Sequence, residues 1–115
     1  MADPKSDWAE EPQALFDSKM SEKAYQDQIV QLAKANNWLV YHTYDSRRSE
    51  PGFPDLIMVK GRRLIVIEVK QQDDKTPKDR MLRQLDWIEA LDGTTVTAFV
   101  ARPSDWERVE KELAE

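Results

Sequence analysis

The fold of this 115-residue chain is decided by the stretch GFPDLIMV at residues 52–59 and the stretch LIVIEVK at residues 64–70. Both are apolar, and KGRR at residues 60–63 separates them, which predicts two antiparallel strands joined by a tight turn. Because side chains alternate across a strand, Glu68 and Lys70 share one face at the end of the second strand. Asp55 lies at the start of the first strand, which is the neighbouring end of the hairpin. We therefore expect three charged side chains to converge at one end of an apolar pair of strands.

Charges in this position need compensation, because burying an unpaired charge is costly. Two carboxylates a few ångströms apart repel each other, and a divalent cation holds both in the ionised form. Oxygen ligands suit Mg²⁺ or Mn²⁺, either of which lowers the pKa of a bound water. The pattern favours metal-dependent hydrolysis of phosphodiester bonds, with Asp55 and Glu68 as metal ligands. Lys70 would orient the water and stabilise the charge that develops on the phosphate.

A purely structural interpretation uses the same three residues. Glu68 and Lys70 can form an ordinary ion pair at the end of a strand, and Asp55 can be a turn residue after Pro54. On that interpretation the chain is an interaction domain whose acidic residues are solvated strand ends.

Pro54-Asp55 together with Glu68-Val69-Lys70 resembles the signature of the PD-(D/E)xK nuclease superfamily. The longer string that begins at Gly52, with HTYDSRR at residues 42–48 before it and Gln84 after it, is similar to the VRR-NUC (virus-type replication-repair nuclease) domain. The resemblance covers roughly residues 21–101. It implies a Mg²⁺- or Mn²⁺-dependent DNA endonuclease in which the backbone carbonyl of Val69 joins the two carboxylates as a metal ligand.

The resemblance also implies roles for two residues outside the hairpin. Glu22, on the preceding helix, is expected in the metal site, where it would hold water or a second metal. Gln84, on the following helix, is expected to hydrogen-bond Lys70 or a substrate oxygen. From the residues alone, Glu22 can also be a first-turn acid that stabilises the helix dipole, and Gln84 can be a partly exposed helical residue.

Small standalone members of the family resemble virus-encoded enzymes that act on branched DNA, including four-way (Holliday) junctions. This implies a phage protein of DNA repair or replication, acting in the cytoplasm of a bacterial host. Resolving a junction takes two symmetrical cuts, so we expect a homodimer. Its interface is expected to use Trp8, Phe16 and Trp106, unless Trp106 packs its own helix onto the sheet. The alternatives are a flap or linear-duplex nuclease and a non-catalytic nucleic-acid-binding module on the same fold.

The charge distribution fits contact with DNA although the net charge is -5. Ten of the 17 lysine and arginine residues lie between residues 40 and 83, against seven acidic residues, so this region carries +3 and the remainder -8. Basic charge is therefore concentrated around the proposed site. His42, the only histidine, is expected to be structural or to contact substrate, because it has no nitrogen or sulfur partner for a metal. The residues expected to contact DNA are Arg47, Arg48, Ser46, His42, Lys75 and Lys78.

Length and composition predict one domain over residues 21–115, preceded by a loose or partner-docking arm over residues 1–20. No stretch approaches the roughly 20 apolar residues that span a bilayer, and the N-terminus does not resemble a signal peptide. The chain has no cysteine. These features predict a cytoplasmic protein that has no contact with a membrane.

The other elements follow from periodicity and capping signals. A helix is expected from the N-cap Ser21 to about residue 36, and a strand over residues 38–44. Thr76 is expected to cap a second helix that ends at Gly93, before a strand over residues 94–100. A capping box at residues 104–107 predicts a terminal helix. The predicted fold class is α/β with a restriction-endonuclease-like core, in which a mixed sheet is flanked by helices in the order α-β-β-β-α-β-α.

Overall fold

The computed structural model describes residues 13–43, 48 and 50–114. None of the described helices is long and apolar enough to cross a membrane. Residues 13–19 are helical, which adds one helix inside the range expected to form a loose arm. The elements that follow confirm the predicted order: α2 (Glu22–Ala35), β1 (Leu39–His42), β2 (Leu56–Lys60), β3 (Arg63–Val69), α3 (Lys78–Asp92), β4 (Thr97–Ala101), the 3₁₀ turn η1 (Pro103–Asp105) and α4 (Trp106–Ala114).

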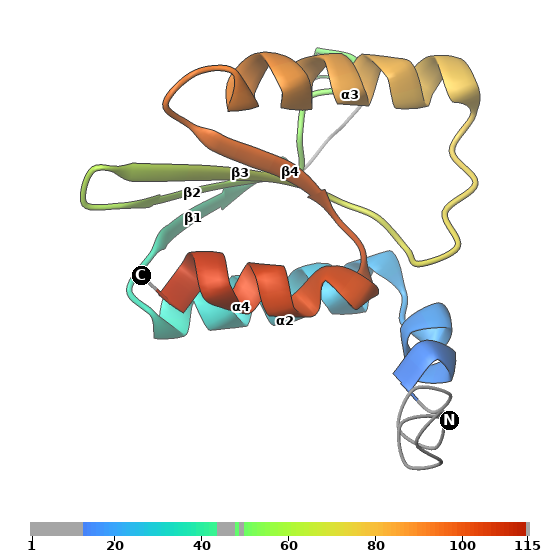
Figure 1. Ribbon diagram of the computed structural model, residues 1–115, viewed down its shortest axis with the longest axis horizontal. Coiled ribbons are helices and arrows are strands. Elements are labelled where there is room, and N and C mark those ends of the chain that lie inside the picture. The colour runs from blue at the N-terminus through green and yellow to red at the C-terminus, as the bar shows by residue number, and fades with distance from the viewer. Residues whose placement is uncertain (1–12, 44–47, 49, 115) are drawn as a thin grey trace, which may run out of the picture.

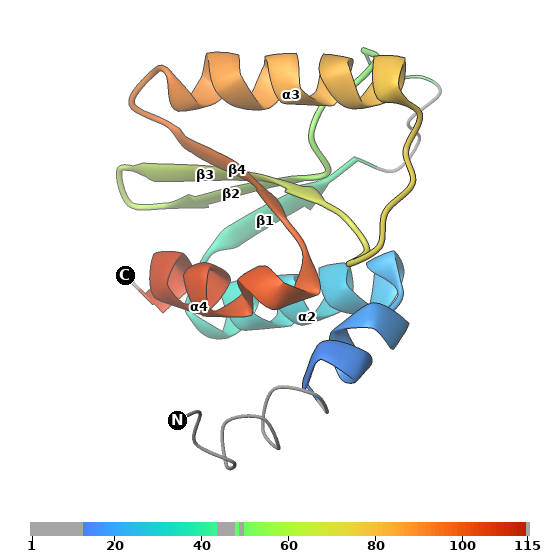
Figure 2. The same ribbon diagram turned by 45° about the vertical axis from the view of Figure 1, so that its right-hand side comes forward.

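The four strands form one mixed sheet in the order β1-β2-β3-β4. β2 pairs with both β1 and β3 in antiparallel fashion, whereas β3 and β4 are parallel, as the strand-helix-strand order predicts. The β2–β3 turn contains Gly61, whose φ of 59° lies in the left-handed region that glycine adopts without strain. Figures 1 and 2 show α3 on one face of the sheet and α2 and α4 on the other.

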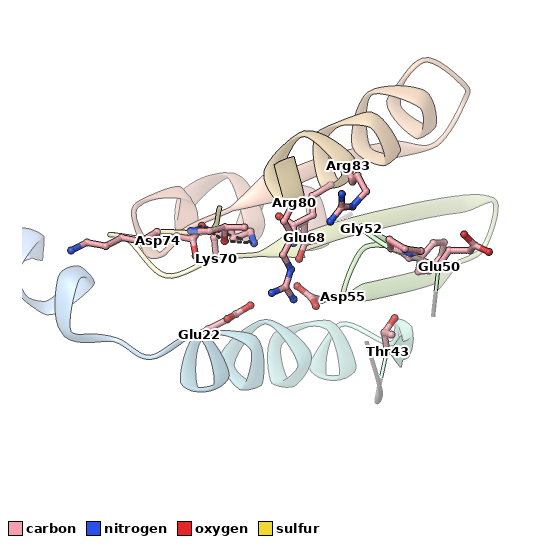
Figure 3. Close-up of a pocket in the computed structure, with 15 residues that line it drawn as sticks. Glu22, Thr43, Glu50, Gly52, Asp55, Glu68, Lys70, Asp74, Arg80 and Arg83 are labelled. Atoms are coloured by element: carbon pink, nitrogen blue, oxygen red, sulfur yellow. Dashed lines mark hydrogen bonds and ion pairs between the residues drawn. The ribbon is translucent and has the colours of Figure 1, made fainter. Parts of the chain in front are cut away.

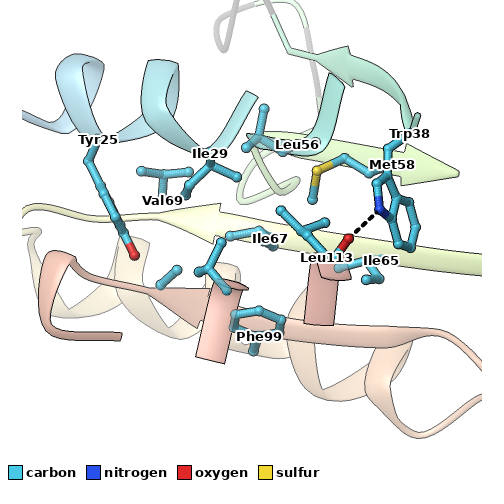
Figure 4. Packing of buried hydrophobic residues seen from close by; sticks show 13 residues of the cluster. Tyr25, Ile29, Trp38, Leu56, Met58, Ile65, Ile67, Val69, Phe99 and Leu113 are labelled. Carbon is cyan, nitrogen blue, oxygen red and sulfur yellow. Dashed lines mark hydrogen bonds between the residues drawn. The ribbon is translucent and has the colours of Figure 1, made fainter. Parts of the chain in front are cut away.

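The larger core cluster lies between the sheet and the pair α2 and α4 (Figure 4). It takes Ile65, Ile67 and Val69 from β3, whereas Val66 packs on the opposite face, in a smaller cluster with Ile88 of α3. The predicted alternation along β3 is thus confirmed. Glu68 has the same parity as Val66, so it belongs to the face of the sheet that α3 partly covers.

β1 is shorter than the predicted strand, because Trp38 precedes it. Asn37 has a φ of 69°, and this left-handed residue turns the chain between α2 and β1. The buried indole of Trp38 then donates its Nε1–H to the carbonyl of Leu113, at 2.9 Å, which ties the start of β1 to the end of α4 (Figure 4). Residue 44, at the far end of the predicted strand, lies outside the described residues.

The helix signals were correct for α2 and partly wrong for α3 and α4. Ser21 caps α2 as predicted, with its Oγ accepting from the Ala24 amide at 3.0 Å. Thr76 does not cap α3, since the N-cap position belongs to Pro77 and makes no side-chain hydrogen bond. The hydroxyl of Thr76 is used in the candidate active site instead. Gly93 ends α3 as predicted.

The terminal capping box is displaced from the predicted position. Ser104 does not cap a helix with its side chain, and its amide donates to Oε1 of Gln72 at 3.0 Å. The carboxylate of Asp105 accepts from the Arg102 amide at 2.8 Å, so one 3₁₀ turn forms before α4 begins. Trp106, at the start of α4, packs edge-on against Tyr25 with ring centroids 6.2 Å apart. Its place is therefore in the packing of α4 on α2, the alternative to an interface role.

Candidate active site

The strand register brings Asp55 and Glu68 to the same end of the hairpin. Leu56 is paired with Ile67, and one step further along both strands reaches Asp55 and Glu68. The backbone of Asp55 is held from the β1 side, where its carbonyl accepts from the Thr43 amide at 2.9 Å. Its side chain reaches β3, since Oδ2 accepts from the Val69 amide at 2.9 Å. The conformation of Asp55 is therefore determined by both neighbouring strands.

Glu68 is only 3 % exposed beside this carboxylate. Burial is the main cause that raises the pKa of Glu68 to about 10, and the hydrogen bond and negative charge of Asp55 raise it further. The positive charge of Lys70 acts in the opposite direction but does not balance these effects. In the absence of another cation, Glu68 therefore stays protonated near neutral pH.

Lys70 is buried at the end of β3, where two residues of the following loop hold its ammonium group. Its Nζ donates to Oγ1 of Thr76 at 3.1 Å, and this hydroxyl donates to Oδ2 of Asp74 at 2.6 Å. Burial raises the pKa of Asp74, but the hydrogen bonds from Thr76 and the charge of Lys70 outweigh burial and hold it below its ordinary value. A charged carboxylate thus lies 4.0 Å from the Lys70 ammonium. Sequence reasoning missed Thr76 and Asp74, for which the only signal was their position in the loop after Lys70.

These groups line a cleft of about 940 Å³ between α2 and α3. Figure 3 shows Glu22 of α2 on one side, Arg80 and Arg83 of α3 on the other, and Asp55 between them. Burial, and after it the charge of Asp55, raise the pKa of Glu22. Glu22 therefore faces the same site as the two carboxylates of the hairpin, as its predicted role requires.

Gln84 of α3 also lines this cleft, and its side chain is buried. Within the described part of the chain, its Oε1 has no hydrogen-bond partner. A buried acceptor without a donor costs free energy, which indicates that water or a bound molecule donates to it in the working protein. The hydrogen bond expected between Lys70 and this oxygen is therefore not formed, and the Lys70 ammonium donates to Thr76.

The loop before Asp55 is docked on α3 at close range. Gly52 has a φ of 84°, and a Cβ there would lie 2.8 Å from the carbonyl oxygen of Arg83. Trp87 donates its Nε1–H to the carbonyl of Pro51 at 3.2 Å, and its ring packs edge-to-face on Phe53 with centroids 5.1 Å apart. Only glycine satisfies both the conformation and the space at residue 52. This contact sets the path of the chain into Asp55.

The residues expected to contact DNA lie in different places. Lys75 lines the cleft, Lys78 is exposed in the first turn of α3, and His42 ends β1. Arg48 is exposed, whereas residues 46 and 47, the predicted Ser46 and Arg47, lie outside the described residues. Arg80 and Arg83 also line the cleft although sequence reasoning did not single them out. Their signal was a three-residue spacing on the helix that carries Gln84.

The donor set of the cleft fits a hard divalent cation. In the described residues, no three side chains of His, Cys, Asp or Glu are grouped to hold a metal ion together. Two carboxylates, Asp55 and Glu68, are available, and a backbone carbonyl adds a third oxygen. The amide of Val69 points toward Asp55, and the carbonyl of a strand residue lies on the same strand edge as its amide. Such an oxygen set, completed by water, is the kind that Mg²⁺ and Mn²⁺ take.

Comparison with known protein families identifies the domain to which this chain is similar. The family model of the VRR-NUC domain matches residues 5–105. This range contains α2, the whole sheet and α3, and therefore every residue of the cleft described above. No curated protein and no solved structure matches the chain.

Proposed function

The chain belongs to the VRR-NUC domain family of PD-(D/E)xK-type nucleases, and we propose that it is a Mg²⁺- or Mn²⁺-dependent DNA endonuclease. One observation carries the proposal. Glu68 is buried beside Asp55, and its pKa of about 10 keeps it protonated near neutral pH unless an added cation compensates its charge. Asp55, Glu68 and the carbonyl of Val69 would hold that cation, and Glu22 would hold water at its edge or a second metal.

A bound divalent cation supplies a Lewis acid that polarises a phosphate oxygen and lowers the pKa of a water molecule. In hydrolysis, the water oxygen forms a new bond to phosphorus while one phosphorus–oxygen ester bond breaks. The Lys70 ammonium, held by Thr76, would donate to the phosphate or to the attacking water as negative charge develops. The exposed Arg80 and Arg83 would bind the phosphates on either side, since planar guanidinium groups match phosphate oxygens. Gln84 would accept from a group in the cleft through Oε1, which has no partner among the described residues.

The finer part of the proposal concerns the substrate and assembly. We propose cleavage of branched DNA such as four-way junctions by a homodimer, in the cytoplasm of a bacterial cell infected by the virus that encodes it. β1 is an edge strand, and Leu39 and Tyr41 on it are 75 % and 59 % exposed. With the partly exposed Val59 of β2, paired with Leu39, they form an apolar patch that supports an isologous contact along β1. In the proposed interface this patch takes the place of Trp106, whereas Phe16 is exposed and Trp8 lies outside the described residues.

The test is a cleavage panel on labelled linear, flapped and four-way-junction DNA, with Mn²⁺, with Mg²⁺ and with chelator. The proposal expects metal-dependent cleavage that Asp55→Asn abolishes. The active species should have the mass of a dimer by light scattering, and Tyr41→Glu should reduce it to a monomer. If a strict monomer cleaves flaps or linear duplex, the proposed metal site stands. The proposals of a homodimer and of a four-way-junction substrate are then rejected. Binding of DNA without cleavage in any metal would favour the non-catalytic module instead.

A further inference from the structure

A second groove lies beside the cleft, between α3 and the loop before Asp55. It has a volume of about 340 Å³ and is lined by Pro51, Arg83, Asp86, Trp87 and Ala90. Two of these residues, Pro51 and Arg83, also line the candidate active site, so the groove continues directly from it. We propose that this groove binds one unpaired nucleobase next to the phosphate that is cut. The inference rests on the proposed nuclease function and adds a feature of the substrate that the function alone does not specify.

Trp87 provides the surface on which a base would stack. Its indole is fixed on two sides, by the hydrogen bond from Nε1 to the carbonyl of Pro51 and by edge-to-face packing with Phe53. A side chain that is already immobile loses little entropy when a ligand stacks on it. Aromatic stacking is the usual means by which proteins bind unpaired bases, because every base has a π face.

The polar groups of the groove fit a base rather than a phosphate. Asp86 brings a negative charge that repels phosphate and accepts hydrogen bonds from ring or exocyclic N–H groups of a base. Guanine presents two such donors in parallel on its Watson–Crick edge, whereas thymine presents one. Arg83, at the boundary with the catalytic cleft, has a side chain that is 50 % exposed and can bind the adjoining phosphate. Base and phosphate would thus be held by neighbouring residues of one helix.

The base in this groove must be unpaired for two reasons. Its Watson–Crick edge has to be free to meet Asp86, and its face has to leave the neighbouring base pair to meet Trp87. The groove lies at the small end of the range for small-ligand pockets, roughly 300–1,000 Å³, which suits one nucleotide and not a base pair. The substrate class that follows is DNA with an unpaired nucleotide at the cut site, as at a branch point, a flap or a single-stranded end.

The first experiment places 2-aminopurine at each nucleotide that flanks the cut phosphate and measures its fluorescence when the DNA binds to the Glu68→Gln protein. This variant is expected to bind the DNA without cutting it. We expect quenching at one position, loss of that quenching in a Glu68→Gln, Trp87→Leu double variant, and no loss when Leu82→Ala replaces Trp87→Leu. Leu82 is a matched control, since it is exposed on the same helix and lines neither the cleft nor the groove. Quenching that persists in the Trp87→Leu variant would overturn the proposal.

A second experiment leaves the protein unaltered, because Trp87→Leu also removes a contact with the loop before Asp55. An abasic residue at the quenched position should raise KM on the order of ten- to a hundred-fold, with little change in kcat. In a separate measurement, an Asp86→Asn variant should show a smaller preference for guanine over thymine at that position. DNA that is cut normally with abasic residues at every flanking position would overturn the inference and leave the nuclease function standing. A protein that neither binds nor cuts DNA would instead overturn the proposed function itself.

Discussion

Replacing Glu68 by glutamine should stabilise the metal-free protein, although it removes a residue of the proposed active site. The folded state raises the pKa of Glu68 from an ordinary value of 4.5 to about 10. At pH 7 the folded chain therefore holds a proton that the unfolded chain has released. One pH unit of such a difference corresponds to about 1.4 kcal/mol, so the two and a half units between pH 4.5 and 7 amount to roughly 3 kcal/mol.

The sign follows from which state binds the proton. Below about pH 4.5 both states are protonated at Glu68, and the group imposes no penalty. As the pH rises toward 10, only the unfolded chain ionises freely, so the free energy of unfolding falls. Glutamine is neutral at every pH and has the same shape. The variant should therefore exceed the wild type by less than about 1 kcal/mol at pH 5 and by up to about 3 kcal/mol at pH 7. The latter difference corresponds to about 10 °C or more in Tm.

The assay is urea unfolding followed by circular dichroism at pH 5, 6, 7 and 8, in the presence of chelator. Glu110→Gln, on the exposed side of α4, is the matched control and should leave stability almost unchanged. Adding Mn²⁺ should stabilise the wild type by about 2.7 kcal/mol at a hundred times its Kd and should not stabilise Glu68→Gln. If Glu68→Gln is no more stable than the wild type, or if the difference in stability does not grow with pH, then the folded state does not raise the pKa of Glu68 to this extent.

The remaining predictions concern groups that the cleft brings together. Lys70→Ala should lower the cleavage rate by on the order of 10²–10³ while DNA affinity, measured by fluorescence anisotropy, stays nearly the same, and an unchanged rate would assign catalysis to another group. Thr76→Val should lower the cleavage rate in single-turnover assays roughly ten- to a hundred-fold, because the Lys70 ammonium loses its acceptor. Thr76→Ser keeps the hydroxyl and should cleave at nearly the wild-type rate. Equal rates for the two variants would contradict this role of Thr76. Gly52→Ala should destabilise the fold by about 1–3 kcal/mol in thermal unfolding. Gly61→Ala should destabilise it less, because a Cβ at residue 61 would meet no described atom within 4 Å. The reverse order would show that the contact of residue 52 with α3 is not tight.

What the sequence determined by itself was local and periodic. Alternation along two apolar runs was sufficient to predict the hairpin, the face that Glu68 and Lys70 share, and their approach to Asp55, because the side-chain period of a strand leaves no other arrangement. The order of the elements was predicted correctly for the same reason, since each signal lies within one element. The N-cap Ser21, which contacts a residue three positions away, belongs to this group.

Tertiary structure alone decided which groups became partners. Thr76 had the pattern of an N-cap, yet its hydroxyl lies between Lys70 and Asp74, because the loop after β3 folds back beside the strand end. Nothing in the sequence indicated a partner for Trp87, and its hydrogen bond joins residues 36 positions apart. Periodicity states the face on which a side chain lies but not the segment that will cover that face. Which segment covers that face depends on how α3 packs on the sheet. The same packing decides which residues support the candidate active site.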